Sequence, residues 1–185
     1  MYGAEYISSG GKAAGDTVYS GGDVYVTSGG VESGSVVGSG GMAFVSSGGA
    51  FSGGAVAGGV LTVSSGGFVS GGLTVSDGGT ANISGSLASG QDVLFYGAGD
   101  LALSNLSNFH ALIGGYSTGD EFDLGGFTSG SGEKFSYTEA ANLLSGTLSI
   151  HDGGLSASLT LLGKYAASDF ALATDGHGGS FVKFV

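Results

Sequence analysis

Paired glycines recur along the first hundred residues at spacings that define a repeat. Pairs begin at residues 10, 21, 29, 40 and 48, so the steps alternate between 11 and 8 residues and add up to a period of 19. Later pairs begin at residues 53, 58, 66, 71 and 78, where single-residue slips blur the count. A period of this length is typical of solenoids, in which each repeat is one structural unit that packs on its neighbours.

Each repeat holds two short apolar stretches, and each stretch is closed by Ser-Gly-Gly or a variant of it. The aligned units span residues 5–23, 24–42, 43–60 and 61–80, and a degenerate fifth unit starts at Ala81. Such stretches are too short for helices, and every glycine in a helix would cost about 1 kcal/mol. Strands separated by tight glycine turns fit instead, because glycine adopts positive φ without a steric clash.

The aligned positions predict how these strands stack. A single coil cannot bury its apolar side chains, but coils stacked about 4.8 Å apart hydrogen-bond in parallel and place equivalent residues above one another. One interior stack is expected at Ile7, Val26, Val45, Val63 and Ile83. Val18, Val37 and Val56 align in another column, and an adjacent polar ladder is expected at Ser8, Thr27, Ser46 and Ser64. The sequence therefore predicts an all-β fold, a parallel β-solenoid of about five thin coils whose handedness stays open.

The composition changes near residue 95. The first hundred residues hold 28 of the 42 glycines, and leucine, phenylalanine and aspartate become more frequent afterwards. We interpret residues 1–95 as the solenoid repeats and residues 96–185 as a β-rich capping module that continues the solenoid and covers its last coil. One short helix is expected in this module, because Ser136 and Glu139 have capping-box spacing and Gly146 would stop the helix.

Charge and composition exclude several classes of partner. Fifteen acidic residues against four lysines give a net charge of −11, and arginine and cysteine are absent. Binding to phosphate requires basic residues, so neither nucleic acid nor an anionic membrane surface is an expected partner. No stretch approaches the roughly 20 apolar residues of a membrane-spanning helix, so membrane insertion is not expected. The composition suits the outside of a bacterial cell.

The repeats, of which residues 24–42 (VYVTSGGVESGSVVGSGGM) are an example, resemble the AIDA-type repeats in passenger domains of bacterial autotransporter adhesins. The resemblance covers roughly residues 5–95. It implies an extracellular stalk or adhesive face, self-association and glycosylation of serine. Residues 1–5 have neither the basic start nor the apolar run of a secretory signal peptide, so a mature segment or a C-terminal export signal is expected.

An acidic segment in the second half is the candidate metal site. Residues 119–124 (GDEFDL), together with 148–150 (LSI) and 175–179 (DGHGG), resemble the terminal module of type I-secreted bacterial surface proteins. The resemblance extends to the segment that closes calcium β-rolls, so Ca²⁺ with oxygen ligands from Asp120, Glu121 and Asp123 is one possibility. Against it, the GGxGxDxUx nonapeptide is missing, and in a strand Asp120 points away from the other two. The expectation is therefore no cofactor, with Ca²⁺ as the alternative.

Catalysis is not indicated. His110, His151 and His177 lie far apart and show no metal-ligand spacing. A glycosidase needs a pair of carboxylates. In the repeats, the acidic residues fall in different columns of the alignment and form no such recurring pair. These residues are Glu5, Asp16, Asp23, Glu32 and Asp77. We therefore predict that the chain is not an enzyme.

Two functions from different classes remain. The first is a structural or adhesive solenoid of a bacterial surface or biofilm matrix. The ends of a solenoid are pairing templates unless they are capped, and no cap is evident before the first coil, so self-association end to end into fibres is predicted. The second is a module that binds glycan or Ca²⁺. Tyr6, Tyr25 and Phe44 line up one per coil and would stack on sugars, unless they serve only in packing.

Overall fold

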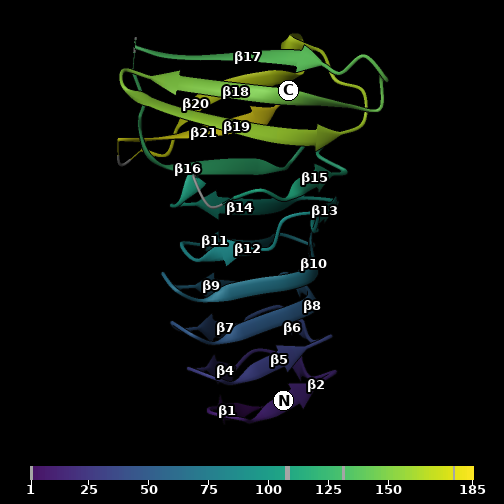
Figure 1. Cartoon of the computed structure of the whole chain (residues 1–185), viewed down its shortest axis with the longest axis vertical. Coiled ribbons are helices and arrows are strands. Elements are labelled where there is room, and N and C mark those ends of the chain that lie inside the picture. The colour runs from purple at the N-terminus through teal and green to yellow at the C-terminus, as the bar shows by residue number, and fades with distance from the viewer. Residues whose placement is uncertain (1, 107–108, 131, 177) are drawn as a thin grey trace.

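Strands from successive repeats stack into two facing sheets that run the length of a rod (Figure 1). The computed structural model describes residues 2–106, 109–130, 132–176 and 178–185, so Met1 and His177 lie outside the described residues. The sheets have nine and twelve strands, and the rod has about six turns. The predicted all-β, parallel β-solenoid is confirmed, with about one turn more than the repeat count indicated.

The nine-stranded sheet takes one strand from each coil. Its parallel strands are, in order, β1 (Gly3–Ile7), β4 (Gly22–Val26), β7 (Met42–Val45), β9 (Val60–Val63), β11 (Gly79–Ile83), β14 (Gly99–Leu103) and β16 (Glu121–Thr128). Gly3 pairs with Gly22, which is the 19-residue offset of the sequence repeat. Met42 pairs with Val60, so the single-residue slip is absorbed between β7 and β9 while the register holds.

The twelve-stranded sheet forms the opposite wall. Its parallel strands are β2 (Lys12–Ala14), β3 (Thr17–Val18), β5 (Val31–Ser33), β6 (Val36–Gly38), β8 (Ala50–Ala57), β10 (Phe68–Ser76), β12 (Ser86–Leu87), β13 (Asp92–Tyr96) and β15 (Leu112–Gly114). A bend divides this wall into two strands in each of the first two coils: β2 and β3 in the first coil, and β5 and β6 in the second. In the third coil the single strand β8 pairs with both β5 and β6.

The two glycines of each Ser-Gly-Gly turn have different roles. The first adopts positive φ, as at Gly29 (φ 78°). The second lies against the backbone of the preceding coil: a Cβ on Gly30 would overlap the carbonyl oxygen of Ile7 and stand 2.7 Å from its carbonyl carbon. One glycine thus permits the turn and the other permits close stacking of the coils.

The predicted interior stack is confirmed, and the column of Val18, Val37 and Val56 is buried as well. All eight side chains are at most 4% exposed, and the outward positions between them alternate with these buried residues along the strands. Burial of these columns is the main contribution that a stack of thin coils has available, since apolar area removed from water stabilises by roughly 25 cal/mol per Å².

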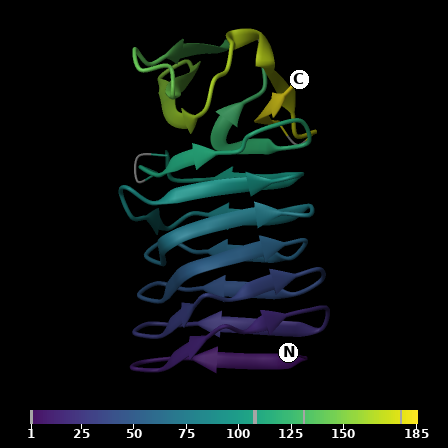
Figure 2. The same ribbon diagram turned by 90° about the vertical axis from the view of Figure 1, so that its right-hand side faces the viewer.

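The C-terminal end is built from antiparallel strands (Figure 2). They are β17 (Glu133–Glu139), β18 (Ser145–Asp152), β19 (Leu155–Leu162), β20 (Phe170–Thr174) and β21 (Gly179–Phe184), with the 3-10 turn η2 (Ala167–Asp169) before β20. β19 joins the two patterns, since it pairs parallel with β15 and antiparallel with β18. Parallel stacking therefore continues past residue 95, and the division of the chain at 95/96 stays a prediction.

The helix expected from Ser136 to Gly146 is wrong. Residues 133–139 form β17, which pairs with β18 over its whole length. Phe135 and Tyr137 alternate with exposed residues and pack against the core, which is the period of a strand. The capping-box spacing is outweighed by this alternation, and Leu143 adopts φ 57° in the turn that follows, which a helix does not permit.

Candidate functional site

The first coil has an open hydrogen-bonding edge. β1, β2 and β3 pair with β4, β5 and β6, and no other strand of the described residues pairs with them (Figure 1). Gly3 N donates to Gly21 O at 2.9 Å, and Ile7 O accepts from Thr27 N at 2.8 Å. Because these directions alternate along a strand, the N–H and C=O groups of Ala4 and Tyr6 point to the unpaired side.

The opposite end of the rod is different in kind. There the sheets finish in the antiparallel strands β17 and β20, and a cluster of aromatic rings fills the space between them. β17 also carries Glu133, Lys134 and Glu139, and charged side chains discourage pairing at a sheet edge. The edge strands β17 and β20 of the C-terminal end are therefore antiparallel and border an aromatic cluster, unlike the edge strands of the first coil.

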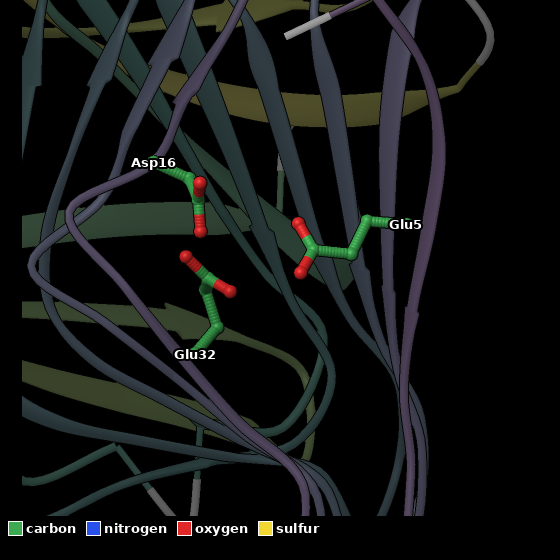
Figure 3. A group of neighbouring side chains, drawn as sticks. All are labelled: Glu5, Asp16 and Glu32. Carbon is green, nitrogen blue, oxygen red and sulfur yellow. The ribbon is translucent and has the colours of Figure 1, made fainter.

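Three carboxylates meet inside the open end. Glu5, Asp16 and Glu32 each place a carboxylate oxygen within 4.8 Å of the others (Figure 3). Glu5 lies on β1, Asp16 lies in the bend between β2 and β3, and Glu32 lies on β5 of the second coil. We call these three residues the acidic cluster. Both walls and two successive coils contribute to it.

The acidic cluster is not evident from the sequence repeats. Glu5 pairs with Val24, and Glu32 pairs with Ala13 and Phe51, so each acid interrupts an apolar column. The repeat alignment correctly placed the acids in different columns, but it orders residues along the rod and does not say which columns face each other across it. The sequence feature that could have revealed the cluster is a carboxylate at an inward-facing position that is apolar in the neighbouring repeats.

Glu32 is the most buried member of the cluster, with 1% of its surface exposed. Its Oε1 accepts a hydrogen bond from the hydroxyl of Ser35, which is equally buried, while its Oε2 has no hydrogen-bond partner in the described structure. Burial raises the pKa of Glu32, Asp16 and Glu5 raise it further, and the Ser35 hydroxyl partly offsets this. Burial and the charge of Asp16 also raise the pKa of Glu5.

The stability of the protein should reflect this raised pKa. A carboxyl whose folded-state pKa lies above its ordinary value of 4.5 favours folding while it is protonated and loses that contribution as the pH rises through the folded-state pKa. In the presence of a chelator, Glu32→Gln should match the wild type in melting temperature near pH 4 and exceed it progressively toward pH 7. Circular dichroism melts of both proteins measure this difference. A constant offset between the two curves would contradict it.

The structure does not bring the predicted calcium residues together. Asp120 is buried, and its Oδ2 accepts hydrogen bonds from the backbone N (2.7 Å) and hydroxyl (3.3 Å) of Ser117. Glu121 forms an ion pair with Lys183 at 2.6 Å, and Asp123 is half-buried on the same face as Glu121. Burial raises the pKa of both Asp120 and Asp123. Calcium binding by these three residues stays a prediction.

The aromatic side chains of the first coils form a stacked ladder on the outside of the rod. Tyr6 and Tyr25 have ring centroids 4.9 Å apart, and Tyr25 and Phe44 5.1 Å apart, with nearly parallel planes. The ring faces between these neighbours are therefore covered, and the outer face of Tyr6, which is 72% exposed, is free. Sugars stack on ring faces, so the ladder presents little surface for glycan binding.

A groove of about 540 Å³ follows the bend of the twelve-stranded wall. Its floor is a column of glycines, and they are Gly34, Gly53, Gly71 and Gly90. Aromatic side chains are absent from its lining, which consists of glycines, small or polar residues and the aliphatic residues Val36, Leu73 and Leu94. This groove offers no stacking platform for a sugar either.

Residues 115–119 (GYSTG) have the Gly-x-Ser-x-Gly spacing of hydrolase nucleophiles, a match that sequence analysis overlooked. The segment connects strand β15 to strand β16, whereas a nucleophile turn leads into a helix. The Ser117 hydroxyl donates a hydrogen bond to the carboxylate of Asp120.

His110 and His151 are exposed and belong to no metal-ligating group within the described residues. The arrangement does not support a catalytic triad.

The strand pairing and the packed interior define the chain as a parallel β-solenoid. No protein-family model and no curated protein matches it. Among solved structures it is similar to one described as a TibC-catalyzed, hyper-glycosylated fragment of TibA. The two share 26% sequence identity and a TM-score of 0.44, with 64% of this chain and 52% of that chain covered. The chain thus spans about half the length of that fragment.

None of the helices in the described residues is long and apolar enough to cross a membrane.

Proposed function

We propose that the chain is a structural and adhesive rod of a bacterial surface or extracellular matrix, and that it associates with a second copy through the open edge of the first coil. The single observation that carries self-association is this edge, where the backbone groups of Ala4 and Tyr6 point outward and no strand of the described residues pairs with them. Such an edge is a template for pairing with another strand. The repeats that resemble AIDA-type repeats, the acidic composition and the lack of cysteine support an extracellular location.

A second molecule of this chain can pair with this edge. Two identical open ends related by a twofold axis would pair β1 with β1 in the antiparallel sense and form a closed, isologous contact. The free face of Tyr6 would then also lie in the contact, next to the Tyr6 of the second copy. Because the C-terminal end is built differently, this contact gives pairs of rods, and the fibres predicted from the sequence would need a further contact at that end.

Ala4→Pro should abolish pairing, because proline removes the N–H that points to the open side while the ladder to β4 is kept. Ala4→Val is the matched control, since it keeps the N–H and favours a strand. Sedimentation velocity, with about 1 mM calcium and with a chelator, should show a species of twice the monomer mass for the wild type and Ala4→Val, and monomer for Ala4→Pro. Wild-type protein that stays monomeric at every concentration in both buffers would refute self-association.

A further inference from the structure

The acidic cluster concentrates negative charge without a compensating cation. Glu5, Asp16 and Glu32 bring up to three negative charges into the interior of the first two coils. In the described part of the chain the lysines form a single ion pair, Lys183 with Glu121, which lies outside the cluster. Burying uncompensated charges is costly, and pairing or metal coordination is the usual way in which proteins keep them.

An unsatisfied ligand atom points into this cluster. Glu32 is 1% exposed, one of its carboxylate oxygens has no hydrogen-bond partner, and its carboxylate faces those of Glu5 and Asp16 (Figure 3). Ser35 holds the other oxygen of Glu32, and the Ser35 hydroxyl also accepts a hydrogen bond from Asp16 N at 3.1 Å. The buried serine therefore fixes the position of one ligand and of the bend that carries a second.

We propose that Glu5, Asp16 and Glu32 form a binding site for a divalent cation, and that Ca²⁺ is the ion the site accepts. Three carboxylates supply only hard oxygen donors, which suit Ca²⁺ and Mg²⁺ and are unlike the nitrogen and sulfur ligands that zinc and copper sites use. Mg²⁺ is held through one or two carboxylates in a strict octahedron, whereas Ca²⁺ accepts a larger and more flexible set. Glu5 is only half-buried, so water can reach the open end and complete the coordination.

The bound ion would fasten the first coil to the second. Its ligands come from β1 on one wall, from the bend after β2, and from β5 in the next coil. Without the ion these segments repel one another through their carboxylates; with it they share one positive centre. The first coil should therefore be more rigid in the presence of Ca²⁺.

Isothermal titration calorimetry of the chelator-treated chain with CaCl₂ tests the site. The expected dissociation constant is on the order of 10⁻⁴–10⁻³ M, the range of extracellular calcium modules. Glu32→Gln and Asp16→Asn should each weaken binding at least tenfold, whereas Asp123→Asn and Asp23→Asn, which change carboxylates outside the cluster, should bind as the wild type does. MgCl₂ should bind more weakly than CaCl₂.

Amide hydrogen exchange gives a second readout that does not depend on binding heat. Exchange at residues 3–7 and 31–36 should slow when Ca²⁺ is added to the wild type and should not respond in Glu32→Gln. The absence of both binding heat and protection in the wild type would overturn the proposal. Loss of binding in Asp123→Asn but not in Glu32→Gln would also overturn it, because the ion would then sit near Asp120 and Glu121.

The cation site does not depend on the pairing of rods. The titration is repeated on Ala4→Pro, which keeps all three carboxylates and lacks the edge N–H needed for association. Binding by a monomeric Ala4→Pro would support the site whether or not the wild type pairs. Binding lost together with pairing in that variant would place the ion between two copies and overturn the site as stated.

Discussion

Gly79→Ala is expected to destabilise the protein by about 3 kcal/mol or more, as overpacking against a rigid backbone does. A Cβ on Gly79 would overlap the carbonyl oxygen of Val56 in the preceding coil and stand 2.8 Å from its carbonyl carbon and 3.0 Å from Ser76 O. These are backbone atoms held by the parallel ladder, so they cannot move aside as the end of a flexible side chain would. The neighbouring coils must separate, and the buried columns on both sides lose contact.

Gly78→Ala is the matched control one residue away. Gly78 has φ 77°, but a Cβ there would meet no atom within 4 Å. The substitution should therefore carry only the conformational cost of a left-handed residue, about 1–2 kcal/mol. Urea denaturation of both variants, followed by circular dichroism, measures the difference. An equal or larger effect at Gly78 would mean that turn conformation, rather than close stacking, sets the need for the second glycine.

The same glycines explain why so much of the fold could be predicted from the sequence. Because each coil repeats the same Ser-Gly-Gly turns, the glycine pairs mark these turns, and the alternation between them assigns Ile7, Val26 and Val45 to one buried column. The slip at Val60 is absorbed without loss of register. In a solenoid each position meets its equivalent in the next coil, so an alignment of repeats is already a contact map along the rod.

What escaped prediction lies across the rod or beyond the repeats. Glu5 and Glu32 belong to opposite walls, and they approach each other at the bend near Asp16. The repeats show that this bend recurs from coil to coil, but they do not show which residues face each other across the rod. At the C-terminal end there are no repeats to distinguish a helix from a strand. The capping-box spacing of Ser136 and Glu139 therefore indicated a helix, although the alternation of buried and exposed residues in the same segment is that of a strand.

Phe170→Ala is expected to destabilise the C-terminal end by about 3–5 kcal/mol, the usual cost of removing a buried aromatic ring. Phe170 is 4% exposed, and five aromatic rings lie with centroids 5.4–6.5 Å from its own. These are the rings of Tyr116, Phe135, Tyr137, Tyr165 and Phe184. They come from segments on both walls, so Phe170 is the centre of the contact that holds β17 and β20 over the last coil.

Phe68→Ala provides the control for the loss of a ring. Phe68 lies on β10 and is 38% exposed. The Phe68→Ala substitution should lower the free energy of unfolding by well under half as much as Phe170→Ala, because the native protein buries far less of the Phe68 ring from water. Thermal unfolding compares the two variants, and amide exchange locates the loss, which should concentrate in residues 133–139 and 170–174 for Phe170→Ala. If the C-terminal strands close that end of the rod, their loosening should also add assemblies larger than pairs in sedimentation. Unchanged assembly with the expected loss of stability would mean that the aromatic cluster does not protect this end, and that the edge of β17 is protected by its own charged side chains.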